Sequence, residues 1–323
     1  MKRRLAVAIA VPALLLAATA CGAGESSSSE DGKEKVTLIL GQAGEPFYIS
    51  MDCGAKQAAK DLDVELDTQG PTAFDATLQN PIIDTVVQKK PGAILIAPND
   101  DKASVNPLKA AQDKGIKTIL VDTVVGDESI GLSRISSDNE AGGVAAAQEL
   151  AKQVGDKGSV LFIGTKPGVS SVDARQRGFE KEIKNHPGIK LLPAQFSNNE
   201  LAKANQIVTD TLTANKDLAG IFAANLTTAD GAAAGLKSSG KQGQVKIVGF
   251  DAGPQQVKQL TDGSVQALVV QKPYDMGYKG VEFALKAIKG ESIEKSVATD
   301  FVVATKENVG SADITKYLYK ESC

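Results

Sequence analysis

The chain has 323 residues, with 36 Lys and Arg against 39 Asp and Glu, and a formal net charge of −3 at pH 7. Without the basic residues at positions 2–4, the 36 basic residues fall to 33 against 39 acidic ones, a formal charge of −6. This balance argues against nucleic acid and against an anionic membrane surface as partners. Beyond the N-terminal segment, no apolar run approaches the roughly 20 residues that a membrane-spanning helix needs.

The N-terminal segment has the pattern of an export signal. Basic residues 2–4 precede the apolar stretch 5–18, and small residues then lead to Cys21. A cysteine at the cleavage point resembles a bacterial lipobox; the alternative is an ordinary signal peptide with an incidental Cys. We predict a signal peptide at 1–20, a lipid on Cys21 and a polar, flexible tether at 21–35. The protein would then be extracytoplasmic and held to the cell membrane by its lipid alone.

The rest of the chain alternates short apolar runs with longer Ala-rich segments of helical period. The predicted strands are residues 36–40, 93–97, 118–121, 160–163, 218–223, 245–250 and 265–270. The clearest predicted helices are residues 46–62, 139–154 and 273–289. Near-continuous apolar strands are typical of parallel sheets that are buried on both faces. The pattern predicts a doubly wound α/β fold, with too many strands for one sheet and therefore two similar lobes.

One further helix is ambiguous, because Pro81 interrupts its pattern. Either Asn80 caps a helix that begins there, or a helix from Asp75 runs through the proline and kinks.

Polar residues end most of the predicted strands. They are carboxylates or amides, namely Asn99, Asp122, Asn225, Asp251 and Gln271. In open α/β sheets, ligands bind beyond the carboxyl ends of the strands, so these side chains are candidates for one binding site. The alternative is helix capping, which we prefer for Asn99.

The chemistry of these residues suits a polyol. Carboxylates accept hydrogen bonds from hydroxyls, and amides both donate and accept. A guanidinium donates to hydroxyl or ring oxygens. Arg175 and Arg177 open a predicted helix and are candidates for that role, or else solvated surface residues. Phe47 and Tyr48 follow the first strand and could pack against the C–H faces of a sugar, or simply belong to the core.

Cysteine usage predicts one disulfide. If Cys21 carries a lipid, Cys53 and Cys323 remain, and two thiols outside the cell tend to pair. That bond would pin the C-terminus onto the first helix. The alternative is two unpaired thiols.

The order of several motifs along the chain resembles the type I periplasmic binding proteins, in particular the ribose-binding branch. The motifs are GEPFY at 44–48, VDT at 121–123, SDNEAGG at 137–143, SVDARQRGF at 171–179, FAAN at 222–225, VGFDAGP at 248–254 and VVQKPYDMG at 269–277. The chain departs from the ribose branch at Glu45, where that branch has Asn, and at Thr123, where it has Arg. An aromatic residue of the second lobe is also replaced near Asn198 or Asn199.

The resemblance implies two lobes joined by three crossing strands, with a sugar buried between them. It implies lobe 1 at 36–137 plus 272–300, lobe 2 at 138–271 plus 301–312, and a C-terminal tail at 313–323 that returns to lobe 1. Hinge crossings would fall near Ser137, Gln271 and Asp300. The implied aromatic sandwich is Phe47 with Tyr48, and the implied polar contacts are Asp122, Arg175, Asn225, Asp251 and Gln271.

Together these features predict a monomeric, lipid-anchored solute receptor that delivers a neutral sugar or sugar alcohol to the permease of an ABC importer. We expect no enzyme activity, cofactor or metal, because the single His186 has no plausible nucleophilic partner and no Gly-rich phosphate loop precedes a helix. A DNA-binding sugar repressor would need a helix-turn-helix where the export signal stands. A ligand-binding sensor subunit, or a receptor for a signalling furanose or nucleoside, stays open.

Overall fold

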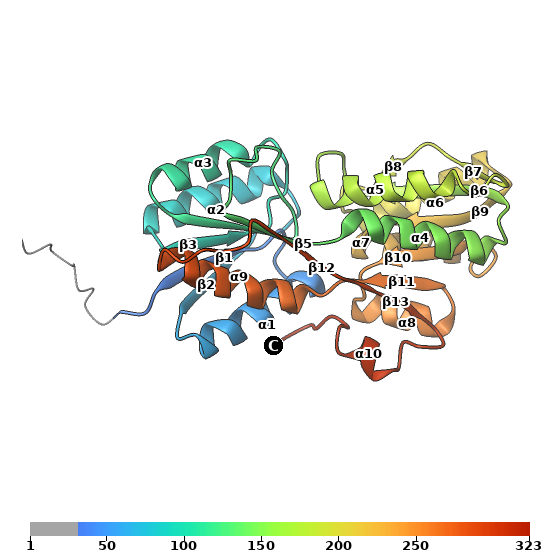
Figure 1. Ribbon diagram of the computed structural model, residues 1–323. Helices are drawn as coiled ribbons and strands as arrows, with labels where there is room; N and C mark the ends of the chain where they lie inside the picture. Colours follow the sequence, from blue (N-terminus) through green and yellow to red (C-terminus); the bar gives the residue numbers. More distant parts are fainter. Residues whose placement is uncertain (1–31) are drawn as a thin grey trace, which may run out of the picture. The chain divides into compact units, whose positions relative to one another are not determined.

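The computed structural model describes residues 32–323, in which two β-sheets are each covered by helices on both faces (Figure 1). The predicted signal peptide, Cys21 and most of the predicted tether lie outside the described residues. Within residues 32–323, no helix is both long and apolar enough to cross a membrane. The predicted doubly wound α/β architecture with two lobes is confirmed.

Lobe 1 is built on a six-stranded sheet in which every neighbouring pair is parallel. In sheet order its strands are β12 (Ser296–Thr299), β5 (Ser133–Ser137), β4 (Lys117–Val121), β3 (Ala93–Ile96), β1 (Lys35–Ile39) and β2 (Glu65–Gln69). Its helices are α1 (Pro46–Asp61), α2 (Ala76–Lys89), α3 (Val105–Asp113) and α9 (Pro273–Ile288). Along β3, Leu95 packs in the core under α1 and α9, whereas Ile94 and Ile96 pack under α2 and α3, so both faces are buried.

Lobe 2 is built on a seven-stranded sheet. In sheet order its strands are β13 (Val302–Thr305), β11 (Ala267–Val270), β10 (Lys246–Phe250), β9 (Leu218–Ala223), β6 (Gly158–Gly164) and β7 (Ile189–Leu191), with β8 (Gln195–Phe196) also beside β6. Its helices are α4 (Asn139–Val154), α5 (Ser170–Ile183), α6 (Leu201–Ala214), α7 (Leu226–Ser238) and α8 (Pro254–Asp262). The pairing is parallel except that β13 runs antiparallel to β11 at the edge.

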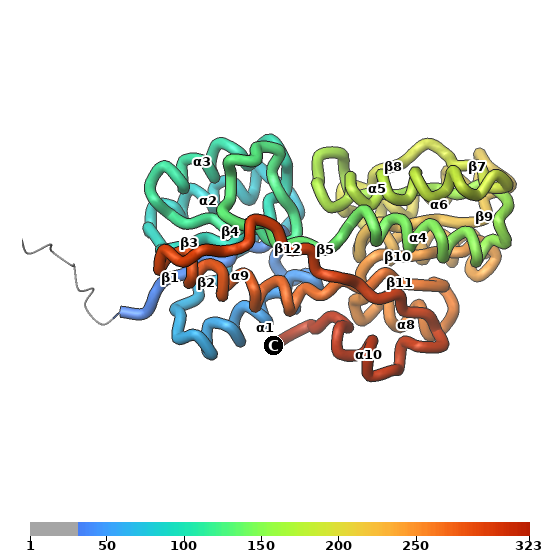
Figure 2. Tube along the Cα trace, in the orientation of Figure 1, coloured from blue at the N-terminus to red at the C-terminus, as the bar shows by residue number. Residues whose placement is uncertain are grey.

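The chain passes between the sheets three times, after β5, after β11 and between β12 and β13 (Figure 2). Hydrogen bonds join these crossings. Ser137 Oγ donates to Gln271 Oε1 at 2.9 Å, and the Asp138 N–H donates to Thr299 O at 3.1 Å. Lys272 Nζ lies 2.5 Å from Asp300 Oδ1. The three connections therefore lie side by side.

The helix around Pro81 begins at Asp75, whose Oδ1 accepts from the Thr77 N–H at 2.8 Å. The helix continues through the proline, so the alternative of an Asn80 cap is wrong. Asn80 instead donates from Nδ2 to Ala103 O at 3.0 Å.

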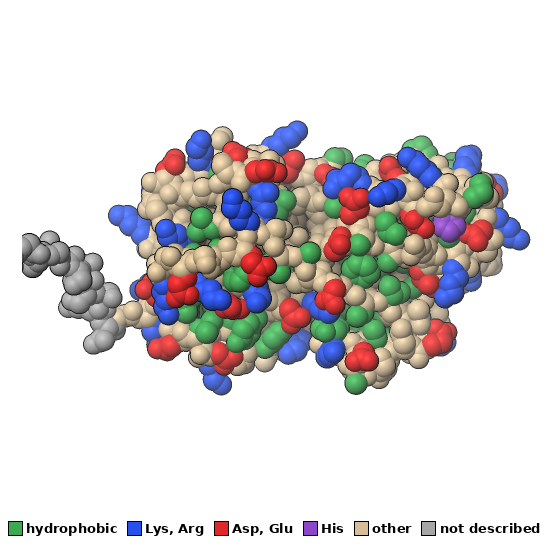
Figure 3. Space-filling model, in the orientation of Figure 1, with side chains coloured by type: hydrophobic (Ala, Val, Ile, Leu, Met, Phe, Trp, Pro, Cys, Tyr) green, Lys and Arg blue, Asp and Glu red, His purple; other side chains and the backbone are tan. Residues whose placement is uncertain are grey.

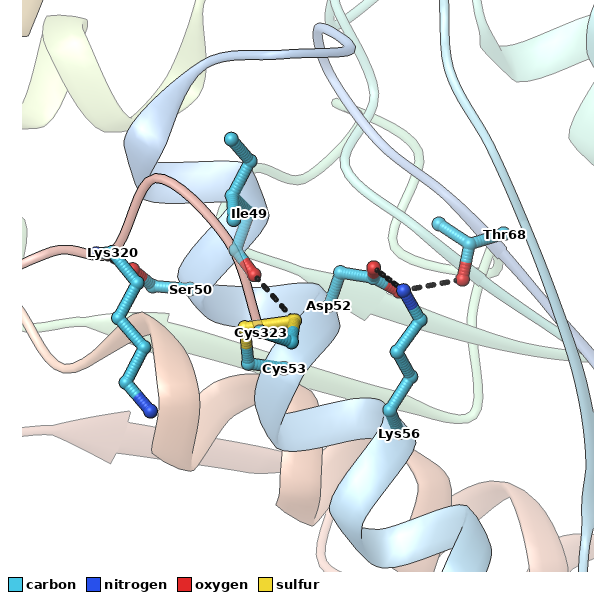
Figure 4. Close-up of a disulfide and its surroundings, with 8 residues drawn as sticks. All are labelled: Ile49, Ser50, Asp52, Cys53, Lys56, Thr68, Lys320 and Cys323. Carbon is cyan, nitrogen blue, oxygen red and sulfur yellow. Dashed lines mark hydrogen bonds and ion pairs between the residues drawn. A yellow bond between two sulfur atoms is a disulfide. The ribbon is translucent and has the colours of Figure 1, made fainter.

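The predicted disulfide is present between Cys53 in α1 and Cys323, whose Cα atoms are 5.3 Å apart (Figure 4). The residues before it hold the tail to both lobes. The Tyr319 N–H donates to Ala252 O of lobe 2 at 3.1 Å, and the Lys320 N–H donates to Ser50 Oγ in α1 at 2.7 Å. The bond closes a loop with a sequence separation of 270. A loop of that length corresponds to about 5 kcal/mol of unfolded-state entropy in the chain-entropy model.

Candidate functional site

A cavity lies where the carboxyl ends of the two sheets face each other. Residues from both lobes line it. They are Glu45, Phe47, Tyr48, Phe74 and Asp122 of lobe 1, with Thr165, Val169, Ser171, Val172, Arg175, Asn199, Asn225, Asp251 and Gln271 of lobe 2. The structure therefore brings all seven sequence-predicted ligand residues to one cavity.

Two aspartates at matching positions of the two lobes share a rare backbone conformation. Asp122 directly follows β4 with φ 64°, and Asp251 directly follows β10 with φ 82°. Each N–H still bonds the neighbouring strand, to Ile135 O and Val269 O respectively, both at 2.8 Å. A left-handed backbone at a non-glycine residue costs roughly 1–3 kcal/mol. Here the turn occurs where each side chain meets the cavity.

Asp251 is held by three donors from different parts of the chain. Its Oδ1 accepts from Gln271 Nε2 at 2.6 Å and from Tyr319 Oη at 2.8 Å. Its Oδ2 accepts from the Leu226 N–H, at the start of α7, at 2.9 Å. A carboxylate has about four acceptor positions, so one stays open for a ligand hydroxyl. Gln271 orients Asp251, since both ends of its amide are already bonded within the protein.

Arg175 is 3% exposed and is fixed by its surroundings. Its Nε donates to Asn139 Oδ1 at 2.8 Å and its Nη1 to Ala224 O at 2.7 Å, while the guanidinium carbon lies 3.7 Å from the centre of the Phe250 ring. A Cβ at Gly143 of α4 would lie 2.1 Å from Arg175 O, so only glycine lets α5 approach this closely. Three of the five guanidinium N–H groups remain free to bind a ligand.

Arg177, the other arginine considered, lies outside this cavity. Its side chain is 63% exposed and lies 3.9 Å from Glu140. The solvated alternative therefore holds for this residue.

Asn225 lines the cavity and also caps α7, so the capping alternative holds and the ligand role stays a prediction. Its Oδ1 accepts from the Thr228 N–H at 3.3 Å, and its Nδ2 donates to Asn199 Oδ1 at 2.5 Å. Asn99 does not line the cavity; it is buried and donates from Nδ2 to Gly41 O at 2.9 Å, which makes it a turn-stabilising residue.

Phe47 and Tyr48, the residues of the aromatic sandwich that the resemblance implies, both line the cavity. Their ring planes meet at 89° with centres 5.0 Å apart. Tyr48 Oη donates to Asp122 Oδ2 at 3.0 Å. Tyr48 therefore positions Asp122 as well as contributing an aromatic surface.

The lobes touch each other directly around the cavity. The Asp101 N–H donates to Gly168 O at 3.0 Å, and the Val124 N–H donates to Ser170 Oγ at 2.8 Å. Asn199 Nδ2 donates to Gln42 Oε1 at 2.9 Å. These three bonds join lobe 1 to lobe 2, so the structure has the closed arrangement.

Comparison with known proteins agrees with this geometry. A family model described as a periplasmic binding protein domain matches residues 36–292. The ribose import binding protein of Escherichia coli is 30% identical over 298 residues, 91% of this chain and 98% of that protein. The chain belongs to the periplasmic binding protein domain family.

Solved structures of similar proteins extend the likeness. An ABC transporter solute-binding protein from Agrobacterium vitis, solved with alpha-D-tagatopyranose, is 40% identical with a TM-score of 0.88 and covers 89% of this chain and 100% of its own. A second from the same organism, solved with D-fucose, is 31% identical with a TM-score of 0.85 and covers 88% and 100%.

Sequence reasoning about this periplasmic binding protein missed several cavity residues. The sequence marks Glu45 and the pair Asn198–Asn199 only as departures from the ribose branch, and it gives no sign of Phe74. These residues lie in loops, where no strand end marks them. For Asn199 the sequence holds one signal, the pair Asn198–Asn199, because Asn adopts the left-handed backbone more readily than most residues. Both residues have that backbone, with φ 57° at Asn198 and 60° at Asn199.

The cavity of this periplasmic binding protein holds three carboxyl groups and one guanidinium. Burial raises the pKa of Glu45 to about 8, and the carboxylates of Asp251 and Asp122 add to the effect. Burial also raises the pKa of Asp122 to about 6, although Arg175 and the Tyr48 hydroxyl oppose the shift. Within residues 32–323, no three His, Cys, Asp or Glu side chains are grouped to hold a metal ion.

Tyr319 was also missed, because the C-terminal tail carries no motif. We predict that Tyr319→Phe lowers the free energy of unfolding by about 1.5–3 kcal/mol, since a buried carboxylate loses a charge-assisted hydrogen bond. Tyr278→Phe is the matched control, because Tyr278 Oη donates to the exposed carboxylate of Asp61 at 3.3 Å. It should change stability by less than about 0.5 kcal/mol. Urea unfolding measures both, and equal effects would contradict the role of Tyr319.

Proposed function

We propose that this protein is the solute-binding component of an ABC importer and captures one neutral sugar or sugar alcohol in the cavity between its lobes. The observation that carries the proposal is the cavity itself, which combines partly satisfied carboxylates, amides, one fixed guanidinium and aromatic rings.

The polar groups match adjacent hydroxyls. Asp251 keeps one acceptor position, Arg175 keeps three donors, and Asn225 adds an amide. A phosphorylated sugar would need several cations, whereas Arg175 is the only Lys or Arg among the described cavity-lining residues. An amino acid would place its carboxylate beside three acidic side chains. An uncharged polyol avoids both conflicts.

The relatives support the same ligand class. One is named for ribose import, and the two solved structures contain tagatose and fucose; all three sugars are uncharged monosaccharides. We infer a binding role rather than a catalytic one, since the relatives are named as import binding and solute-binding proteins. The proposed partners are the permease subunits of the importer, and the proposed unit is a monomer. Acidic and basic side chains are interspersed over the face shown in Figure 3, which gives nucleic acid no uniform basic surface.

We further propose that residues 36–137 with 272–300 move as lobe 1, and residues 138–271 with 301–312 as lobe 2, with 313–323 as the tail. Closure would bend the three crossings near Ser137, Gln271 and Asp300. The separate sheets and the hydrogen bonds that join the crossings support this division.

For location, we propose that residues 1–20 are a signal peptide, that Cys21 carries a lipid and that residues 21–35 are a tether. Cys21→Ser should then move the protein from the membrane fraction to the soluble fraction, because the lipid would be its only attachment. Cell fractionation with antibody detection measures this shift. An intact mass of the native protein without a lipid at Cys21 would refute the anchor.

The ligand class is tested with a panel of D-ribose, D-tagatose, D-fucose, D-arabinose and galactitol, beside amino acids, nucleosides and sugar phosphates. We expect one neutral sugar or polyol to raise the melting temperature as its concentration passes Kd. At a free ligand concentration of 100 times Kd, the stabilisation should be about 2.7 kcal/mol. Asp251→Ala should weaken binding about 30-fold or more, since it removes one partner of a buried charged hydrogen bond. Circular dichroism checks that this variant folds. Stabilisation only by amino acids, nucleosides or anions would overturn the assignment.

A further inference from the structure

Among the described residues, Glu45 is the one cavity-lining carboxyl that no hydrogen bond holds in place. It precedes α1 with extended backbone at φ −81° and ψ 132°, and its side chain makes no capping hydrogen bond to that helix. Within residues 32–323 its carboxyl has no hydrogen bond or ion pair, yet it lines the cavity. In contrast, Asp122 accepts from Tyr48, and Asp251 accepts from three donors.

Three charged groups act on Glu45 from different elements. Asp122 follows β4, Asp251 follows β10 and Arg175 lies on α5. Two phenols complete the surroundings: that of Tyr48 on α1 interacts with Glu45, and that of Tyr319 in the tail bonds Asp251. Glu45 is half-buried, and three ionised carboxyls against one guanidinium would leave two net negative charges in one cavity that is partly shielded from water, which is unfavourable. Protonation of one carboxyl relieves this, and Glu45 is the group with no donor to stabilise its anion.

Resting on the proposed function, we propose that Glu45 enters the closed cavity as a neutral carboxylic acid and donates its O–H to an oxygen of the bound sugar. The protein therefore takes up one proton together with its ligand. A neutral acid supplies a donor that a carboxylate lacks, so Glu45 complements the acceptors Asp122 and Asp251. Glu45 is thus a specificity residue for an uncharged acceptor oxygen.

The expected pH dependence follows from the difference between the open and closed forms. In the closed form, burial above all raises the pKa of Glu45 from its ordinary 4.5 to about 8. In the open form we expect Glu45 to be solvated and its pKa to stay near the ordinary value. Protons therefore favour the closed, liganded form: affinity is greatest at low pH and falls as pH rises towards 8. The pKa of Asp122 is raised to about 6, so its contribution lies mostly below that pH. Burial raises the pKa of both phenols well above 10, which leaves Glu45 to dominate between pH 6.5 and 8.

The test is titration calorimetry with the tightest-binding of D-tagatose, D-fucose and D-ribose, in phosphate and in Tris buffer. The different ionisation enthalpies of these buffers reveal proton uptake directly. For the wild type we expect close to one proton taken up per sugar at pH 7, and a Kd that rises about 15-fold from pH 6.5 to pH 8.

Glu45→Gln keeps an N–H donor but cannot titrate, so its Kd should change less than about twofold over the same range, without proton uptake. Glu200→Gln is the matched control. Glu200 also precedes a helix without a capping hydrogen bond, but it is exposed and lies outside the cavity. This variant should keep the wild-type pH profile and proton uptake.

Sugar binding without proton uptake would overturn this inference and leave the proposed function standing. A Glu45→Gln variant that folds but loses binding at every pH would also overturn it, because the site would then need the anion. If no neutral sugar of the panel binds, both proposals fall together.

Discussion

The carboxylate of Asp251 joins parts of the chain that are otherwise far apart. Its three donors come from the start of α7, from the crossing after β11 and from the C-terminal tail. The tail is in turn fixed to α1 through the disulfide at Cys53, so the network reaches from lobe 2 to lobe 1. A buried carboxylate is stable only while its donors stay in place. The position of the crossing and the tail is therefore tied to the geometry of the ligand cavity.

A second constraint is the balance of charge inside the cavity. Two aspartates are turned into it by left-handed backbones, which cost roughly 1–3 kcal/mol each. Arg175 provides the one described cation, held by Asn139 and by the Phe250 ring. Such a cavity disfavours anions and offers many more acceptors than donors. A neutral Glu45 corrects that imbalance, which explains how an acidic residue can stand where the ribose-binding branch has an amide.

Much of this arrangement was predictable from the sequence, for a physical reason. Strands such as β9 and, after Lys246, β10 are apolar because helices bury both faces, and the polar residue that ends each of them, Asn225 or Asp251, lines the cavity. Asn99 after β3 is the exception, because it is buried in a turn instead. The edge strands β2 and β12 are half-exposed and polar, so periodicity did not reveal them. Glu45, Phe74 and Asn199 reach the cavity from loops, and Tyr319 bonds a residue 68 positions away. Such contacts depend on tertiary packing that a local pattern does not encode.

The central claim is that the lobes close around a neutral sugar, and small-angle X-ray scattering measures this most directly. The present structure has the lobes joined by the bonds from Asp101 to Gly168 and from Val124 to Ser170, so it represents the closed form. We predict that the sugar-free protein has a larger radius of gyration and that a saturating sugar brings its scattering into agreement with this structure. Scattering that is unchanged by a sugar shown to bind would contradict hinge closure.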